Sequence, residues 1–229
     1  MEPLMERLNH QERENLIAAS HRLHVPKNSS VFKEGARADY LYLIHNGSVR
    51  IFKSIEPAKD LTIFTRGAND GFGEIGVFGG VNYSNSAKAM QDTELYRIKR
   101  ETITDILSQN GWLSLHFTRW IAESLEASKA KMRDYIAFGS EGAVASVFVR
   151  YANMYGVVTP KGISITEPIM IQDISRHIAV SRETVSRIVN KWKKMGVISS
   201  GDKHFQVIDM AYFRKMLACH QCSVENCVL

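Results

Sequence analysis

The sequence lacks any long uncharged apolar stretch. A helix that crosses a bilayer needs roughly 20 consecutive apolar residues, and no segment of the 229-residue chain approaches this length. The N-terminal segment MEPLMERLNHQERENL is charged and has no apolar core of the kind found in signal peptides. These two absences predict a soluble, cytoplasmic protein with no membrane partner.

Cysteine and proline are also scarce. The chain has three cysteines and five prolines, and no low-complexity run. An odd number of cysteines argues against a disulfide framework. With 45% hydrophobic and 23% charged residues, the composition is typical of a folded protein that buries a core.

Positive charge is concentrated in one part of the chain. Residues 171–216 hold nine lysines and arginines against four aspartates and glutamates, a net charge of +5. Residues 1–170 hold 20 basic and 19 acidic groups, a net of +1, and the tail adds one glutamate. The whole excess therefore lies in 171–216, where it favours binding to a polyanion.

The segment 172–190, QDISRHIAVSRETVSRIVN, has the pattern of two short amphipathic helices. Ile174 and Ile178 give the first piece an apolar side, and Ser181 stands where the second piece needs an N-cap. Ala179 lies in the junction, where many helix-turn-helix motifs carry glycine. Alanine at this position departs from that pattern and would need an unstrained turn.

Four polar residues are expected on the outward face of the second piece: Arg182, Glu183, Ser186 and Arg187. Arginine can donate to the two acceptors of guanine, and glutamate can accept from the amino group of cytosine. A helix-turn-helix presents such residues to the major groove from the first turns of its second helix. We interpret the segment as a DNA-recognition element; a solvated helix with scattered charges is the alternative.

A wing follows the two helices. Residues 197–198 and 205–208 have strand character and flank a turn that contains Gly201-Asp202. The run SRETVSRI followed by such a wing resembles the DNA-binding domain of the CRP/FNR family of bacterial transcription regulators. Members of this family act on double-stranded DNA together with RNA polymerase.

The resemblance assigns roles to individual residues. Arg182, Glu183 and Arg187 stand where cyclic-AMP-binding members have their base-reading trio, which implies a TGTGA-like half-site in an inverted repeat. Ser186 and Arg187 also match the reading face of the Fnr branch. Gln172, which opens the first helix, is expected to contact a phosphate.

The N-terminal part has a different pattern. Residues 5–24 predict a short helix that Pro26 ends, and short strands and turns continue to about residue 98. Asn46-Gly47 lies between two alternating runs, which predicts a β-hairpin. Evenly spaced short strands with glycine-bearing turns predict a small antiparallel barrel or roll.

Two stretches, YLIHNGSVRIF (42–52) and GFGEIGVFGG (71–80), resemble the cyclic-nucleotide-binding β-roll of the same family. In nucleotide-binding members the glutamate that corresponds to Glu74 is followed by an Arg-Ser pair, whose arginine neutralises the phosphate. Here no arginine or lysine occurs between residue 81 and Lys88. A buried phosphate without a cation is costly, so cyclic AMP is not expected as a ligand and Glu74 is interpreted as structural.

Helical periodicity replaces the strand pattern over 101–138. A long helix is expected over 112–136, with a seam that fits a two-stranded coiled coil. The seam consists of Phe117, Ile121, Leu125, Ser128, Met132 and Tyr135. The family places its dimer helix here, so we expect a homodimer; packing of the seam on its own domain is the alternative. Residues 138–142 predict a hinge, and 143–154 the first helix of the DNA-binding domain.

The three cysteines form a motif. Cys219, Cys222 and Cys227 are spaced C-x2-C-x4-C, and closely spaced thiolates can bind a soft metal centre. Zinc would require four nitrogen or sulfur ligands, with His220 or His204 as the fourth. An iron–sulfur cluster is normally held by four cysteines, so its fourth ligand would come from another residue type, another subunit or solvent.

The cysteine motif resembles that of the Bacillus-type Fnr branch of the family. That branch carries a C-terminal Cys-x2-Cys-x4-Cys and completes an oxygen-labile [4Fe-4S] cluster with an aspartate at the end of the dimer helix. The resemblance assigns this role to Asp134, in the segment KMRDY. Without the resemblance, Asp134 would be interpreted as a solvated aspartate at a helix end, paired with an arginine. As a hypothesis, the cluster ties the tail to the dimer helix and so fixes the angle of the recognition helices.

Together these patterns predict an α+β protein. It has a cyclic-nucleotide-binding-like antiparallel β-roll at 1–100, a dimerisation helix at 101–138, a winged helix-turn-helix at 139–216 and a cysteine-bearing tail at 217–229. We expect an oxygen-sensing, homodimeric regulator of anaerobic transcription. The alternative within binding proteins is a regulator that binds a small ligand in the β-roll and structural zinc in the tail. No constellation of acid and base residues indicates an enzyme.

Overall fold

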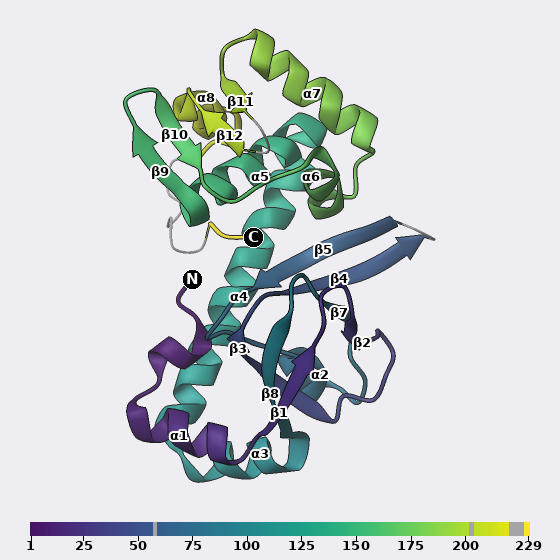
Figure 1. Ribbon diagram of the computed structural model, residues 1–229, viewed down its shortest axis with the longest axis vertical. Helices are drawn as coiled ribbons and strands as arrows, with labels where there is room; N and C mark the ends of the chain where they lie inside the picture. The colour runs from purple at the N-terminus through teal and green to yellow at the C-terminus, as the bar shows by residue number, and fades with distance from the viewer. Residues whose placement is uncertain (57–58, 202–203, 220–226) are drawn as a thin grey trace. The chain divides into compact units, whose positions relative to one another are not determined.

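The protein is described from a computed structural model, which covers residues 1–56, 59–201, 204–219 and 227–229. The chain forms two compact units. The N-terminal unit comprises Glu2–Ala58 and Thr62–Ala122, and the C-terminal unit comprises Glu123–Leu229 with Met1 and Lys59–Leu61. Helix α4 (Gly111–Ala137) contributes to both units (Figure 1).

The N-terminal unit is built mainly of two antiparallel sheets. Its strands are β1 (His21–Val25), β2 (Ser30–Phe32), β3 (Tyr40–Asn46), β4 (Val49–Glu56), β5 (Lys59–Arg66), β6 (Gly71–Phe72), β7 (Ser86–Ala89) and β8 (Thr93–Lys99). They form one sheet in the order β1-β8-β3-β6 and a second in the order β2-β7-β4-β5. The helices are a 3-10 turn (Leu4–Arg7), α1 (His10–Ala18), α2 (Glu74–Gly79) and α3 (Arg100–Gln109). This confirms the expected antiparallel roll in an α+β fold.

Aromatic rings from both sheets fill the interior of the roll. Phe32 of β2 stacks on Tyr83 with a centroid distance of 3.7 Å and lies 5.9 Å from Phe72 of β6. Tyr42 of β3 stacks on Phe72 at 5.1 Å. Tyr42, Phe72 and Tyr83 are all buried. Because each ring brings a large apolar area out of water, this cluster joins the two sheets.

A buried carboxylate fastens α4 to the roll. Asp70 accepts hydrogen bonds from Nη1 of Arg66 at 2.9 Å, from Nε1 of Trp120 at 2.9 Å and from the backbone N–H of Leu4 at 3.2 Å. Arg66, Asp70 and Trp120 are all almost completely buried. A buried charge is tolerated when it is paired and hydrogen-bonded in this way, and the contact fixes the first half of α4 within the N-terminal unit.

The helix predicted over 5–24 is wrong at its C-terminal end. Helix α1 ends at Ala18, and His21–Val25 form strand β1, which pairs with β8. Leu23 and Val25 are two residues apart and pack on the core of the roll, which is the period of a strand. Pairing with β8 therefore overrides the helical spacing that Leu16 and Leu23 suggest.

The hairpin predicted at Asn46-Gly47 is also wrong. Strand β3 pairs with β6 and β8, whereas β4 pairs with β7 in the other sheet. Gly47 has φ +100°, and a Cβ there would lie 2.5 Å from Oγ1 of Thr93 and 2.8 Å from its Cα. The turn therefore moves the chain from one sheet to the other, and it needs glycine for its conformation and for the close approach of Thr93.

The C-terminal unit is a winged helix-turn-helix. After the end of α4 come α5 (Gly139–Tyr155), β9 (Gly156–Thr159), β10 (Gly162–Ile165), α6 (Ile171–Ile178), α7 (Arg182–Lys194), β11 (Ile198–Gly201), β12 (His204–Val207) and α8 (Met210–Met216). The strands form one sheet in the order β11-β12-β10-β9. The predicted wing is confirmed as β11 and β12, and the β9–β10 hairpin was not predicted from the sequence.

Helix α5 is the centre of this unit. Phe148 on α5 stacks on Phe213 of α8 at 5.9 Å and meets Phe205 of β12 edge-on at 5.1 Å. The break before α5 is shorter than the predicted hinge, because α4 ends at Ala137 and α5 begins at Gly139. Gly139 has φ +60°, a value that glycine adopts without strain. The first helix of the DNA-binding domain therefore starts at Gly139 and not at residue 143.

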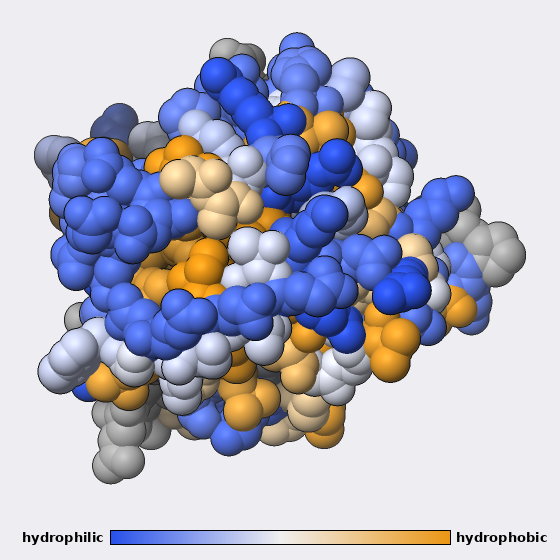
Figure 2. All heavy atoms as spheres, turned by 90° about the horizontal axis from the view of Figure 1, so that it is seen from below, coloured by the Kyte–Doolittle hydropathy of each residue, from blue (hydrophilic) through white to orange (hydrophobic). Residues whose placement is uncertain are grey.

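The outer face drawn in Figure 2 is mostly hydrophilic, with hydrophobic residues gathered in a few patches. In the described part of the chain, no helix has the length and the apolar character that crossing a membrane requires.

We predict that Gly47→Ala destabilises the protein more than Gly35→Ala. Both glycines have a positive φ, but only Gly47 lies against backbone atoms, and a Cβ at Gly35 would meet nothing within 4 Å. The left-handed conformation alone costs roughly 1–2 kcal/mol, and overpacking at Gly47 should add about 1–3 kcal/mol. Urea unfolding of both variants measures the difference; equal losses would show that Thr93 does not constrain the turn.

Candidate functional site

Helices α6 and α7 are positioned by buried apolar residues that the sequence predicted. Ile174 and Ile178 of α6 and Val185, Ile188 and Val189 of α7 all belong to the core of the C-terminal unit. Ser181 caps α7, since its Oγ accepts from the backbone N–H of Thr184 at 3.2 Å. The cap satisfies one of the free N–H groups at the start of the helix. The helix-turn-helix geometry is thus set locally.

The turn between the two helices is tighter than expected. Ala179 has φ +53° and ψ +27°, which is the left-handed conformation. The turn at this position is therefore not the unstrained one that alanine would need. Ser175 closes the turn by donating from Oγ to the carbonyl of Val180 at 2.6 Å. The alanine accepts a conformation that glycine adopts more easily, because the buried faces of α6 and α7 fix the turn between them.

The start of α7 presents a charged surface. Arg182, Glu183 and Arg187 are exposed, whereas Ser186 is half-buried. Ser186 is therefore less available than the sequence predicted. The three exposed residues span the first two turns of the helix, which is the part that a helix-turn-helix inserts into the major groove.

A groove runs from the start of α6 and α7 to the wing. Its lining includes Gln172, Arg182, Ser200, Gly201 and His204. Gln172 is half-buried at the start of α6 and lines the same groove as Arg182. Backbone and polar groups of this kind contact phosphates in protein–DNA complexes. The groove thus joins the recognition helix and the wing into one surface.

The groove also bears on the zinc alternative. His204 lies on β12 and lines the groove together with Arg182. His204 therefore lies on the surface that the helix-turn-helix and the wing share. His220, the other candidate, lies outside the described residues.

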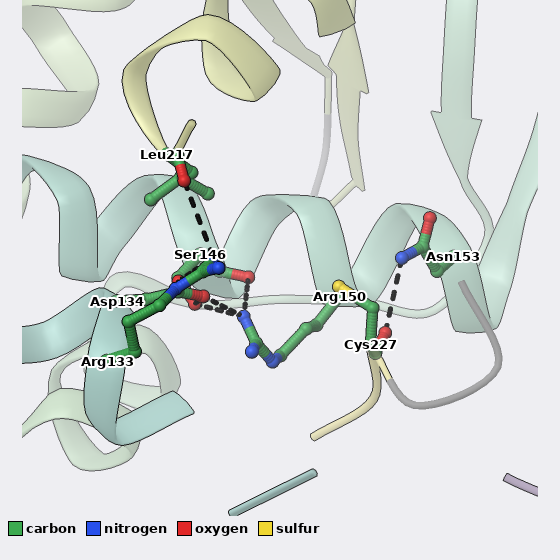
Figure 3. Close-up of polar contacts among 7 residues, drawn as sticks. All are labelled: Arg133, Asp134, Ser146, Arg150, Asn153, Leu217 and Cys227. Atoms are coloured by element: carbon green, nitrogen blue, oxygen red, sulfur yellow. Dashed lines mark hydrogen bonds and ion pairs between the residues drawn. The ribbon is translucent and has the colours of Figure 1, made fainter. Parts of the chain in front are cut away.

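Asp134 is buried near the end of α4, with an exposed fraction of 2%. Its Oδ2 accepts from Oγ of Ser146 at 2.8 Å and from Nη1 of Arg150 at 2.7 Å. Its Oδ1 accepts from Arg133, with Nη2 at 2.7 Å (Figure 3). The interpretation of Asp134 as a solvated side chain is therefore wrong, whereas the pairing with arginine is correct. Burial raises the pKa of the neighbouring Tyr135 to about 12.

The chain leading to the cysteines is held close to Asp134. Nη2 of Arg133, which binds Asp134, also reaches the carbonyl of Leu217 at 3.4 Å (Figure 3). Ala218 is left-handed with φ +48°, and the backbone N–H of Cys219 donates to the carbonyl of Arg214 at 2.9 Å. This is the hydrogen bond that closes a helix C-terminus, and it fixes where the cysteine segment leaves α8.

The other end of the segment is attached to α5. Nδ2 of Asn153 donates to the carbonyl of Cys227 at 3.2 Å (Figure 3). The side chains of Cys219 and Cys227 are half-buried and pack against the core of the C-terminal unit. Cys222 lies outside the described residues.

One face of α5 contacts two parts of the predicted metal site, the side chain of Asp134 and the backbone of Cys227. Ser146, Arg150 and Asn153 follow each other at spacings of four and three, so they share a face of the helix. The first two hold Asp134 and the third holds Cys227. Within the residues that the structure describes, no three His, Cys, Asp or Glu side chains form a complete metal site. Thiols and carboxylates are nevertheless donor types that an iron–sulfur or zinc centre uses.

Several residues of this site were not predicted. Arg150, Ser146, Arg133 and Asn153 carry its hydrogen bonds. A signal for Arg150 was present, because it follows the apolar run 147–149 in a helix that is buried over 142–150. A charged residue in such a run needs a buried partner. The identity of that partner could not be read from the sequence.

Of the residues that the resemblance assigns to nucleotide binding, the roll contains Glu74 but no arginine or lysine at residues 81–87. Glu74 begins α2 and is buried, and burial raises the pKa of its carboxyl group, opposed by the nearby charge of Arg66. The ring of Tyr83 and the neighbouring aromatic rings occupy the interior of the roll. A nucleotide among these rings would have to displace them.

Comparison with known proteins defines the family. The cyclic nucleotide-binding domain model matches residues 22–110, and the Crp-like helix-turn-helix domain model matches residues 143–216. The anaerobic regulatory protein of Bacillus subtilis (strain 168) is 33% identical over 216 residues, which cover 93% of this chain and 91% of that protein. The chain belongs to the CRP/FNR family of transcription regulators: it is a DNA-binding regulator and not an enzyme.

More distant relatives share the architecture. A CRP-like cAMP-activated global transcriptional regulator of Mycobacterium tuberculosis (strain H37Rv) is 23% identical over 184 residues, covering 80% of this chain and 82% of that protein. The structure of a CooA mutant from Carboxydothermus hydrogenoformans superposes with a TM-score of 0.81 at 19% identity and covers 94% of this chain and 96% of that chain. This likeness supports the fold.

We predict that Arg187→Ala weakens specific DNA binding by about 1–3 kcal/mol and relaxes preference at one base pair, because it removes a bidentate contact to a base. Arg214→Ala is the matched control, since Arg214 is an exposed arginine of the same unit on α8. Fluorescence anisotropy with a set of half-site variants at fixed salt measures both. If Arg187→Ala instead loses the same affinity for every half-site variant, Arg187 contacts only phosphate.

Proposed function

We propose that the protein is a homodimeric, cytoplasmic regulator of anaerobic gene expression. It senses oxygen through a [4Fe-4S] cluster bound by Cys219, Cys222, Cys227 and Asp134. It binds a TGTGA-like inverted repeat through Arg182, Glu183 and Arg187 and acts on RNA polymerase there.

One observation carries this proposal. Asp134 and Cys227 are far apart in the sequence, yet both are hydrogen-bonded to the same face of α5. The carbonyl of Leu217, two residues before Cys219, is bonded to the neighbour of Asp134. The buried carboxylate and the backbone at both ends of the cysteine segment are thus attached to α5 and the end of α4, which supports a shared centre. The Bacillus subtilis relative is an anaerobic regulatory protein, which agrees with the proposal.

The residues fit the role of ligands. A [4Fe-4S] cluster, when bound, supplies a centre that oxygen destroys. Cys219 and Cys227 provide soft thiolates at two ends of one segment, and Asp134 provides a single hard oxygen, which iron binds less strongly than thiolate. Asp134 is therefore the ligand that we expect to leave the cluster most easily.

The same contacts modify the hypothesis about signal transfer. Arg133 and Asp134 already join the end of α4 to Leu217, Ser146 and Arg150 of the DNA-binding part. The connection between the end of α4 and the DNA-binding part therefore does not require a bound cluster. We propose that loading the site exchanges partners of Asp134 within this connection, and that this exchange biases the orientation of α7.

An exposed apolar stripe on α4 supports the homodimer. Leu125, Met132 and Ile136 lie at spacings of seven and four, and their exposed fractions are 55%, 60% and 76%. Phe117 at the start of the predicted seam is buried in the N-terminal unit, where it meets Phe78 edge-on. Tyr135, the last residue of the predicted seam, packs against the core of the C-terminal unit. The exposed residues Leu125 and Met132 of the seam, together with Ile136, are therefore the ones available to a second copy of the helix.

We predict that the double substitution Leu125→Glu with Met132→Glu converts the dimer to a monomer. Each buried Leu or Met contributes about 1.5–3 kcal/mol, and a two-fold dimer loses each contact twice. Val158→Glu is the matched control, because Val158 is an 84% exposed valine in the β9–β10 hairpin. Sedimentation equilibrium should show a monomer for the double variant and a dimer for the control. A dimer in both cases would contradict the assignment.

We predict that protein purified without oxygen contains about four irons and four sulfides per chain, with a visible absorption that air bleaches. Asp134→Asn should lower the iron content and weaken oxygen-dependent DNA binding, since an amide is a poorer ligand than a carboxylate. Asparagine keeps the shape of the side chain, whereas alanine would leave Arg150 buried without its partner.

Three measurements decide the outcome: metal and sulfide analysis, the visible spectrum, and DNA binding before and after exposure to air. Asp173→Asn is the control, because the described partners of this carboxylate are local: Arg176 on the same helix, α6, and the backbone N–H of Met170 just before that helix. One zinc per chain, no colour and no response to air would exclude the oxygen sensor and favour structural zinc in the tail. A full cluster in Asp134→Asn would exclude Asp134 as a ligand.

A further inference from the structure

Arg150 is the buried group that the proposed function leaves unexplained. Its side chain is 1% exposed, and its Nη1 bonds both Oδ2 of Asp134, at 2.7 Å, and Ser146. Its Nε has no hydrogen-bond partner among the residues that the structure describes. A buried N–H without an acceptor is rare, because its desolvation is not compensated. The same holds for Nε of Arg97 and Nε1 of Trp192, but only Arg150 lies beside the proposed metal site, which would supply an acceptor.

The position of Arg150 on α5 suggests what that acceptor is. Arg150 lies one turn after Ser146, which binds Asp134, and one turn before Asn153, which binds the carbonyl of Cys227 (Figure 3). The guanidinium therefore lies on the helix face to which the carboxylate and the end of the cysteine segment are both attached. Thiolates and a carboxylate in this region carry negative charge, and a buried cation offsets it.

The two oxygens of Asp134 have different surroundings. Oδ2 is held by Ser146 and Arg150, both completely buried. Oδ1 accepts from Arg133, whose side chain is 42% exposed and also reaches the carbonyl of Leu217. Oδ1 is therefore the oxygen on the side of the cysteine segment. Its arginine can move into solvent, whereas the partners of Oδ2 cannot.

We propose that Arg150 is a positioning residue of the metal–thiolate centre, and this inference rests on the proposed function. Arg150 holds Asp134 through Oδ2, so that Oδ1 is presented to iron as a single ligand atom. Its Nε–H donates a hydrogen bond to a sulfur of the centre. Arg133 leaves Oδ1 when the site is loaded. Outer partners of this kind orient metal ligands and commonly change metal affinity by roughly 10–100-fold when they are removed.

Arg150→Lys tests the inference. Lysine keeps a positive charge that can pair with Asp134, but it has no Nε–H and lacks the second terminal nitrogen of a guanidinium group. Wild type and variant are loaded with iron and sulfide without oxygen, and the loss of visible absorption to a chelator is followed anaerobically. We expect the variant to lose its absorption roughly 10–100-fold faster than the wild type. Arg133→Lys is the matched control and should lose it at the wild-type rate, because Arg133 is displaced on loading.

Each outcome has a definite meaning. If the wild type takes up no iron and sulfide, both the proposed function and this inference fail. If the wild type loads and Arg150→Lys releases iron at the wild-type rate, the role of Arg150 is excluded and the proposed function stands. Thermal unfolding of the metal-free proteins shows whether Arg150→Lys is folded. If it is not, Arg150→Gln decides, since glutamine keeps an amide donor that can reach Asp134 but has no Nε–H; an unchanged rate in that variant overturns the inference.

Discussion

The C-terminal unit depends on the buried ion pair between Asp134 and Arg150. The two side chains are 3% and 1% exposed, and their atoms are 2.7 Å apart. Removing one partner of such a pair leaves an uncompensated buried charge, which costs about 3–5 kcal/mol. The pair joins the end of α4 to α5, and α5 in turn carries the packing of α7, β12 and α8 through Phe148. Changes at Asp134 are therefore transmitted to the recognition helix through a packed core.

This dependence changes how sensing is understood. If a bound centre made the only connection between the dimer helix and the DNA-binding part, its loss would simply disconnect them. Here the connection exists in the chain alone, through Arg133, Asp134 and Arg150. Under the proposed function, the metal-free protein would then be a second ordered state in which α4 and the DNA-binding part stay connected. A regulator with two ordered states is switched by the difference in free energy between the contacts that Asp134 makes in each state. This difference is smaller than the free energy of either set of contacts.

Local patterns in the sequence predicted the recognition element well, and long-range contacts account for what was missed. Ser181 as a cap and the apolar faces of α6 and α7 depend on neighbours in the sequence. By contrast, the role of Gly47 depends on Thr93 in β8, and strand β1 exists because β8 pairs with it. Arg150 was visible as a charge in an apolar helix, but its partner lies on another helix. The sequence shows that such a residue needs a partner and does not show which one.

The N-terminal unit has become a support for α4 in this chain. Asp70 fixes Trp120 of α4, and the rings of Phe32, Tyr42 and Tyr83 fill the space between the sheets. A nucleotide phosphate inside the roll would need a cation, and residues 81–87 provide none. A signal that enters through the roll would have to repack this aromatic core. A signal that enters at Asp134 has only to exchange the partners of one carboxylate beside the DNA-binding helices. Repacking an aromatic core requires more free energy than exchanging the partners of one carboxylate. This difference favours a sensor at the C-terminal end of α4.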